Sequence, residues 1–301
     1  MLKRDRSIFK GGLNVKNENS YKKWIYPGTT FLFLITIIPT IFLFGISLFH
    51  YELGRPLNQA TFAVFSNYVS VFKNPQFWHS LLITAEYVIV SVGSEMILGF
   101  LIAYFLYNRN DKLRDLLIIF MIIPMTIAPS IAGLIWRLNF HPIYGMVNQF
   151  LGMTFGIMPD WYSYNLALWT LIFVDIWQWT PFITLISLAG LLSVDESVIE
   201  SAKVEGANKF QLIYHIFIPL IRPILLIGLI MRLMDNLKMF DVAFTLTEGG
   251  PGNATELLSM FIYRIGFFHT GNIGLAASVA VILLIIMTFL ATRMTNLIKQ
   301  S

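Results

Sequence analysis

Two sets of residues in the second half of the chain place polar groups beside aromatic or thioether side chains. The sets are Asp175, Gln178, Trp179 and Phe182, and Arg232, Asp235, Asn236 and Met239. Within each set the positions run i, i+3, i+4 and i+7, so each set would share one face of a helix. Carboxylate, amide and guanidinium groups hydrogen-bond hydroxyls, and aromatic rings stack on the apolar faces of sugar rings. We therefore expect the two sets to bind a hydroxyl-rich ligand such as a sugar.

The charged members of these sets also have a purely structural interpretation. Arg232 and Asp235 are three residues apart, so they could form an ion pair that only neutralises the two side chains or stabilises a subunit interface. Ionisable side chains inside apolar segments are costly and mostly face a bundle interior or a water-filled cavity, and spacing alone leaves both interpretations open. Glu86 and Glu95 are nine residues apart and half a turn out of phase, so they predict no shared site. We expect at least one of them to bond a neighbouring helix.

The helices that carry these residues must lie in a membrane. Of the 301 residues, 56 % are apolar and 13 % are charged, whereas soluble proteins carry about 25 % charged residues. Six segments are long and apolar enough to cross about 30 Å of hydrocarbon. They are expected at about 27–49, 80–106, 116–137, 166–192, 213–235 and 273–295. The sequence therefore predicts an all-α membrane protein with six transmembrane helices, in which Pro124 and Pro129 interrupt the third.

Lys and Arg residues in the connecting segments predict the orientation. With the N-terminus inside, 14 of these residues lie in cytoplasmic segments and 4 in the opposite segments. We therefore expect a multi-pass protein with both termini in the cytoplasm. Residues 1–23 would form a cytoplasmic N-terminal segment, and residues 24–301 the membrane domain. The net charge of +4 is too small and too dispersed to indicate a nucleic-acid partner.

The segment between the fourth and fifth spans, residues 193–212, is too polar to cross a membrane and too patterned for a simple linker. Ser193 or Asp195 can cap a helix whose early acidic residues suit the positive end of its dipole. Gly206 would end that helix and permit a tight turn. The sequence predicts a short helix, a turn and a second helix on the cytoplasmic face. This element could dock in a groove of another protein or merely connect two spans.

Two stretches of the sequence match known patterns. The first comprises Glu200, Ser201, Ala202, Gly206, Ala207, Ile216 and Pro219. The second comprises Phe240, Asp241 and residues 246–255. The first resembles the EAA loop of the permease subunits of ATP-binding-cassette (ABC) importers, from which Ser201 and Ile218 are small departures. The second resembles a loop of the carbohydrate-importing branch, which includes the maltose and glycerol-phosphate permeases, and the resemblance covers nearly the whole chain from residue 24.

This resemblance implies a type I importer permease fold with a cytoplasmic coupling helix. The chain would be a permease subunit that forms half of the translocation path for a sugar or oligosaccharide. Its implied partners are a second homologous permease, two ABC ATPase subunits that bind ATP and magnesium, and an extracellular or periplasmic solute-binding protein. The EAA loop, with Glu200, Ala202 and Gly206, would couple the ATPase to alternating access. The implied location is the cytoplasmic (inner) membrane of a prokaryote.

Other functions lack their expected features in this sequence. The main alternative is a stand-alone secondary transporter or channel, but such proteins typically carry internal repeats or about 10–12 spans. An intramembrane enzyme would need a convergent nucleophile, acid–base pair or metal site, yet the chain has no Cys and its five His residues lack metal-ligand spacing. Gly249, Gly250 and Gly252 lack the Lys-Ser/Thr pair of a phosphate loop. We therefore expect a non-catalytic subunit without a metal or cofactor of its own.

Overall fold

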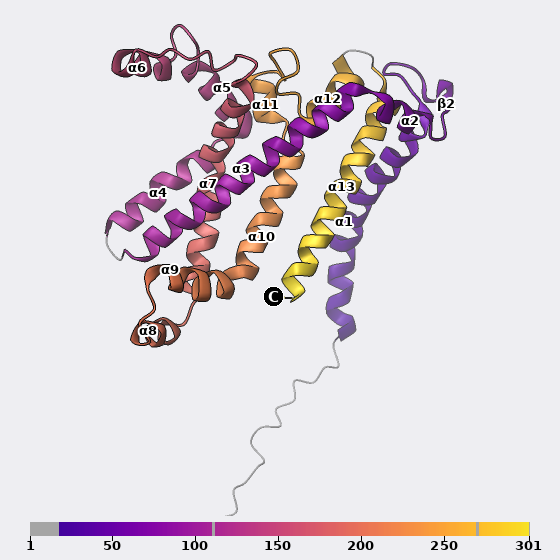
Figure 1. The fold of residues 1–301 in the computed structure, drawn as a ribbon. Coiled ribbons are helices and arrows are strands. Elements are labelled where there is room, and N and C mark those ends of the chain that lie inside the picture. The colour runs from indigo at the N-terminus through magenta and orange to yellow at the C-terminus, as the bar shows by residue number, and fades with distance from the viewer. Residues whose placement is uncertain (1–17, 110–111, 269–270, 301) are drawn as a thin grey trace, which may run out of the picture.

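The computed structural model describes residues 18–109, 112–268 and 271–300, and helices dominate these residues (Figure 1). Five helical stretches are long and apolar enough to cross a membrane. They are Ile25–Ser47 within α1 (Glu18–Ser47), α3 (Pro75–Tyr107), α7 (Ala167–Leu192), Lys209–Leu237, and Ile273–Lys299 within α13 (Ile273–Gln300). The predicted all-α membrane class is confirmed. Residues 1–17 of the expected N-terminal segment 1–23 lie outside the described residues, and α1 already includes residues 18–23.

The remaining expected span, 116–137, is broken. It consists of α4 (Lys112–Thr126) and α5 (Pro129–Asn139), which are bent by 98° relative to each other. Pro129 opens α5, where its missing N–H removes no helical hydrogen bond, and Ala128 before it is non-helical, with φ of −58° and ψ of 137°. Pro124 stays inside the last turn of α4. The interruption expected from the two prolines therefore falls at residues 127–128.

The long stretch Lys209–Leu237 is not uniform. It begins with the short helix α9 (Lys209–Gln211), continues through the π-helical turn Leu212–Phe217, and becomes α10 (Ile218–Leu237). Pro219 lies in the first turn of α10 and Pro223 inside it. A π-helical turn adds a residue per turn and shifts the faces that the helix presents. It joins α9 to α10.

Short elements gather at the two ends of the bundle (Figure 1). Helix α8 (Glu196–Val204) lies at one end. At the opposite end lie α2 (Ser66–Lys73), α6 (Met146–Phe155), α11 (Asp241–Leu246) and α12 (Leu258–Tyr263). The strands β1 (Phe49–His50) and β2 (Thr61–Phe62) pair antiparallel at that end, with Phe49 opposite Phe62, and a 3₁₀ turn (Leu57–Gln59) lies between them.

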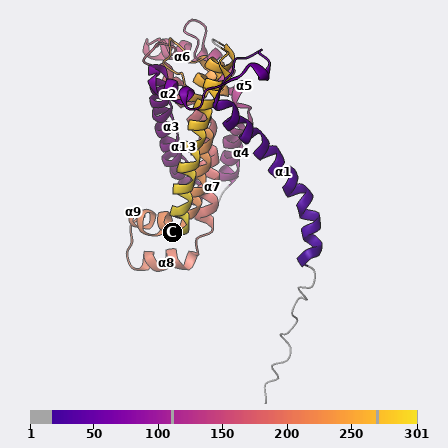
Figure 2. The ribbon, with the colours of Figure 1, turned by 90° about the vertical axis from the view of Figure 1, so that its right-hand side faces the viewer.

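Helices α3, α7 and α10 form the centre of the bundle. At the crossing of α3 and α7, a Cβ on Gly99 would lie 2.7 Å from Ile183 Cγ2, so glycine permits the close approach of the two helices. Helix α1 contacts α13 near one end but diverges from the bundle along its length (Figure 2). Most of its apolar side chains are therefore exposed within this chain. The central three helices provide the buried environment in which polar groups can be held.

Candidate functional site

The α8 segment, residues 193–212, folds as a helix, a turn and a second helix, as its sequence predicts. The Asp195 carboxylate caps α8 by accepting a hydrogen bond of 2.9 Å from the Ser197 backbone N–H. Hydrogen bonds from Ser197 lower the pKa of Asp195 below its ordinary value of 3.8. Gly206 follows the helix with φ of +86°, a left-handed conformation that favours glycine. Asn208 then caps the next helix through Gln211.

The residues of the EAA-like pattern lie mostly at the surface of the α8 segment and the turn after it. Glu200, Ser201, Gly206 and Pro219 are exposed, while Ala202, Ala207 and Ile216 are half-buried. The buried side chain of Ile199 anchors α8 to the bundle. Two large apolar side chains that sequence analysis did not single out, Val204 and Phe210, are 88 % and 75 % exposed. An exposed apolar patch on a protruding element is typical of a contact surface for another protein.

A second polar site lies inside the bundle, where Arg232 joins α3, α7 and α10. Its guanidinium donates to both oxygens of Glu95, from Nε at 2.7 Å and from Nη2 at 2.9 Å. Nη2 also donates to Asp175 Oδ1 at 3.1 Å and to Asn236 Oδ1 at 2.7 Å. Asn236 Nδ2 in turn donates to Asp175 Oδ2 at 2.7 Å. These four side chains, which we call the central network, are all fully buried.

Trp179 and Gln178 border the central network from α7. The Trp179 ring lies 4.6 Å from Arg232 Cζ, which is cation–π distance. Among the described residues, Arg232 Nη1, Trp179 Nε1 and Gln178 Oε1 are buried without a hydrogen-bond partner. Buried polar atoms without partners are costly, and sites that bind polar ligands carry them. Two donors and one acceptor in and beside the network therefore lack a hydrogen-bond partner within the described residues.

Gln178 also connects the network to the broken helix. Its Nε2 donates to the Ile127 backbone carbonyl at 2.8 Å, in the gap between α4 and α5. This carbonyl is one of those that the proline-containing break leaves without an intrahelical partner. A side chain of a neighbouring helix therefore stabilises the bend, as expected for an interrupted helix inside a bundle.

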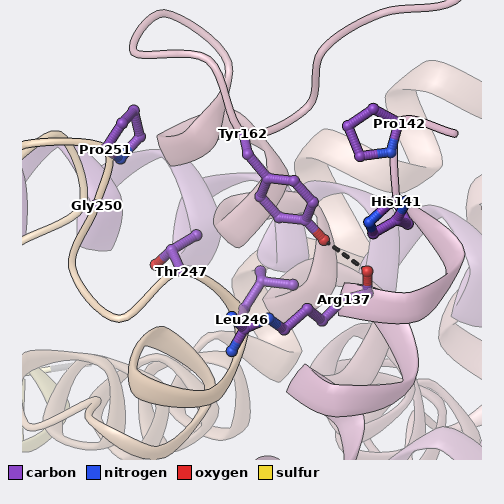
Figure 3. Close-up of a pocket in the computed structure, with 8 residues that line it drawn as sticks. All are labelled: Arg137, His141, Pro142, Tyr162, Leu246, Thr247, Gly250 and Pro251. Carbon is purple, nitrogen blue, oxygen red and sulfur yellow. Dashed lines mark hydrogen bonds between the residues drawn. The ribbon is translucent and has the colours of Figure 1, made fainter.

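A cavity of about 340 Å³ lies between α5, α11 and the loops near them (Figure 3), and these two helices lie at the end of the bundle opposite α8 (Figure 1). The lining residues include Arg137, His141, Tyr162, Thr247 and Pro251. The Tyr162 hydroxyl points at Arg137 and donates to its carbonyl at 2.9 Å, as Figure 3 shows. Burial raises the pKa of Tyr162 to about 12, so the phenol stays protonated and remains a donor.

The Arg137 side chain is paired as well. Its Nη1 lies 2.9 Å from Glu248 Oε1, so the ion pair ties α5 to the loop after α11. The cavity walls are thus held together by hydrogen bonds and an ion pair between segments far apart in the sequence. Sequence analysis missed this cavity, because its lining residues come from α5, α11 and separate loops and share no common spacing.

The sequence matches the family model described as binding-protein-dependent transport system inner membrane component over residues 95–301. The chain belongs to this family of permeases. The probable ABC transporter permease protein y4oQ of Sinorhizobium fredii is 37 % identical over 242 residues, which cover 80 % of this chain and 78 % of that protein. The trehalose/maltose transport system permease protein MalF of Thermococcus litoralis is 32 % identical over 260 residues and 86 % of each chain.

Solved structures agree with the fold of this permease. A bacterial ABC transporter involved in the import of the acidic polysaccharide alginate contains a chain that superposes with a TM-score of 0.79, at 18 % identity. The match covers 94 % of this permease and 97 % of that chain. The predicted permease fold of an ABC importer in the inner membrane is therefore confirmed.

The structure brings together several of the residues that spacing placed on two helix faces of this permease. Asp175, Arg232 and Asn236 meet in the central network. Asp235 does not join them: it lies 3.1 Å from Lys238 Nζ and its side chain is 45 % exposed. The ion pair between Arg232 and Asp235 that their spacing would permit is not formed. The Arg232 guanidinium pairs instead with Glu95 of α3 and Asp175 of α7.

The other expected residues lie at the edges of the permease's central network. The rings of Trp179 and Phe182 meet edge to face with centroids 6.3 Å apart, and both are half-buried. Met239 is buried, and its carbonyl accepts a hydrogen bond from Ser259 Oγ. Glu95 is the network member that helical spacing did not assign to the site. The expectation that one of two glutamates bonds a neighbouring helix is confirmed for Glu95, whereas Glu86 is exposed.

Within the residues that the structure describes, no three or more His, Asp or Glu side chains converge as they would around a metal ion. The carboxylates of the central network are directed at Arg232 instead.

Proposed function

We propose that this permease forms half of the translocation path for a sugar or oligosaccharide in an ATP-driven importer. Among its relatives, one is named for trehalose and maltose and another, from Agrobacterium fabrum, for sulfoquinovosyl glycerol. A structural neighbour was solved in complex with an alginate pentasaccharide-bound periplasmic protein. The single observation that carries the proposal is the family match, because it covers the segment from Glu95 to the C-terminus that holds the central network and α8.

The proposed complex contains a second homologous permease, two ATPase subunits and an extracellular or periplasmic solute-binding protein. ATP and magnesium bind to the ATPase subunits. Helix α8 docks in a cleft of the ATPase through the exposed surface around Glu200, Ala202 and Gly206. The half-buried Ala202 and the glycine at the turn support this contact, because small residues permit close backbone approach. Closure of the ATPase dimer moves α8, and the two permeases rock so that the path opens outward.

In this proposal the central network and its borders line the path. The sugar receives hydrogen bonds from Arg232 Nη1 and Trp179 Nε1, which have no partner among the described residues. Asp235, Met239 and Phe182 contribute the neighbouring surface. Both termini lie in the cytoplasm together with α8, so the cavity of Figure 3 faces the side from which the sugar arrives.

The test has two steps. First, calorimetry with the cognate solute-binding protein across panels of sugars, amino acids and peptides identifies the ligand. Second, the complete importer is reconstituted in proteoliposomes, and uptake of that ligand is measured with and without ATP. We expect ATP-dependent uptake of a sugar. Binding of amino acids or peptides instead of any sugar would overturn the substrate class, and uptake without the ATPase would favour a stand-alone transporter.

The assignment of the path is tested separately by Asn236→Ala and Asp235→Ala in the same importer. We expect each variant to weaken the sugar dependence of uptake and of ATP hydrolysis. Glu86→Ala is the matched control, since Glu86 is a charged residue of α3 that lies outside the network. Unchanged sugar dependence in both variants would remove these residues from the path while leaving the family assignment intact.

A further inference from the structure

Helix α6 presents an exposed apolar face at the end of the bundle opposite α8 (Figure 1). Met146, Phe150 and Met153 are 70 %, 64 % and 86 % exposed within this chain. Their spacing of four and then three residues places them on one side of the helix, and we call them the α6 face. Ile143 before the helix and Ile157 after it add two further exposed apolar side chains.

The opposite side of α6 is held by the protein, so the direction of the α6 face is fixed. Val147 packs against the buried core of the bundle. The buried Asn148 amide donates to the carbonyls of Pro142 at 3.1 Å and Pro159 at 3.0 Å. Trp161 Nε1 donates to Asn148 Oδ1 at 2.6 Å. One side chain therefore ties together the segments before and after α6 and holds the helix in one orientation.

The surroundings of the α6 face have the composition of a membrane interface. Residues 138–159 contain no Asp, Glu, Lys or Arg. Helix α6 connects the end of α5 to the start of α7, which is one of the apolar helices long enough to span the membrane. Tyr144, Tyr164 and Trp169 lie in this connection and in the first turn of α7, and all three are exposed. Tyr and Trp are enriched where spanning helices meet the headgroups.

The α6 face also lies beside the exposed apolar side chains of the neighbouring helices. Helix α6 contacts α5, on which Leu134 and Leu138 are exposed. Leu151 of α6 and the exposed Phe173 of α7 line one cavity. Large exposed apolar patches mark contacts with protein or with lipid. A specific protein interface takes about 20–30 residues a side and has a polar rim, so three apolar side chains in a charge-free segment favour lipid.

We propose that α6 lies in the headgroup region of the membrane leaflet farther from α8, with the α6 face directed at the acyl chains. Burial of the three side chains stabilises this position, and basic residues that attract anionic headgroups are not needed. The helix thereby holds the end of α5, and with it one half of the broken span, at a constant depth. This inference concerns the lipid surface and does not depend on the transported ligand.

The test uses the complete importer in phosphatidylcholine nanodiscs. This chain has no native Cys, so Met146→Cys, Phe150→Cys and Met153→Cys can each carry a single spin label. Asn58→Cys is the control, because Asn58 is exposed in the 3₁₀ turn at the same end of the bundle. Power-saturation spectra measure collisions of the label with oxygen, which dissolves in acyl chains, and with a nickel chelate, which stays in water. We expect the three α6 labels about 5–10 Å below the headgroups and the control label in water.

The same spectra distinguish lipid from water and from protein. Labels on α6 that collide with the nickel chelate as often as the control label does would place the α6 face in water and overturn the proposal. Labels shielded from both reagents would overturn it as well, because they would identify a protein contact. Such shielding before the solute-binding protein is added would assign the contact to the second permease, and shielding only afterwards would assign it to the solute-binding protein.

Co-purification of the second permease and the ATPase with each labelled variant checks assembly. We expect all four variants to assemble as the wild type does, because the substituted side chains are exposed within this chain. Loss of a partner subunit from the three α6 variants, but not from Asn58→Cys, would identify the α6 face as a subunit contact and overturn the proposal.

Discussion

The central network and the α8 segment hold their polar residues in opposite ways. Arg232, Glu95 and Asp175 are fully buried, and each depends on partners from other helices. In the α8 segment the polar residues are exposed, and the nearby chain supplies the hydrogen bonds, as the Asp195 cap shows. Buried charges need their partners, whereas exposed charges retain water. Motion of α3, α7 and α10 relative to one another would therefore break hydrogen bonds of the central network. The capping hydrogen bond of α8 would remain, so α8 is suited to move as a unit.

The largest expected effect comes from removing one partner of the network. Glu95→Ala leaves the buried Arg232 guanidinium without its two-pronged partner, and loss of one member of a buried ion pair costs about 3–5 kcal/mol. We expect a clearly lowered midpoint of thermal unfolding for the purified importer. Glu86→Ala, on the same helix but exposed, is the control and should leave the midpoint near that of the wild type. Equal midpoints for the two variants would mean that the network does not stabilise the bundle.

A smaller effect is expected at the break between α4 and α5. Gln178→Leu removes the hydrogen bond to the Ile127 carbonyl, and leaving a buried acceptor unsatisfied costs about 1–3 kcal/mol. The variant should unfold at a lower temperature, and spin labels on α4 and α5 should report a broader distance distribution. Thr126→Val serves as control, because its hydroxyl bonds the Ile123 carbonyl at an exposed position. A narrow, wild-type distribution for Gln178→Leu would show that the bend is stabilised by other contacts.

The sequence predicts the α8 segment well because its determinants are local. A capping Asp195 and a glycine at the turn act within a few residues of themselves. Helical spacing is also a local property, so it correctly placed Asp175 with Gln178 on one face of α7 and Arg232 with Asn236 on one face of α10. Spacing describes one helix at a time, however, and Glu95 is 137 positions from Arg232. Which carboxylate pairs with the arginine depends on how α3, α7 and α10 pack.

The third expected span, residues 116–137, likewise depends on both neighbouring and distant residues. Pro124 and Pro129 predict an interruption, because proline removes a donor and restricts the residue before it. The 98° bend between α4 and α5 does not follow from those residues alone. A hydrogen bond from Gln178, 51 positions away, helps to stabilise it. The prolines predict the place of the break, and the packing of α7 selects its geometry.

The turn after α8 provides a third prediction. Gly206 has φ of +86° and open space around its Cα, so Gly206→Ala meets no steric contact and costs only the strain of a left-handed conformation, about 1 kcal/mol. We expect faster hydrogen exchange in α8 and fewer sugar molecules taken up per ATP hydrolysed. Gly156→Ala is matched to it, with φ of +68° and open space in a loop after α6. An equal fall in sugar uptake per ATP hydrolysed in both variants would show that a strained left-handed residue has this effect wherever it lies. The position of Gly206 directly after α8 would then not be responsible.

The smallest effect is expected from the pH dependence of the α8 cap. The folded state lowers the pKa of Asp195, so its carboxylate stabilises α8 at pH values above the ordinary value of 3.8, and this contribution is lost as the pH falls through the lowered pKa. The protection factors of the α8 amides, which correct for the intrinsic pH dependence of exchange, should therefore fall below pH 3.8 in the wild type. Asp195→Asn keeps a side-chain oxygen to accept the Ser197 N–H and should show no such step. Asp195→Ala should show low protection factors in α8 at every pH. A step that persists in Asp195→Asn would assign the titration to a residue other than Asp195, and the Asp195 cap would then not be the local contact that stabilises α8.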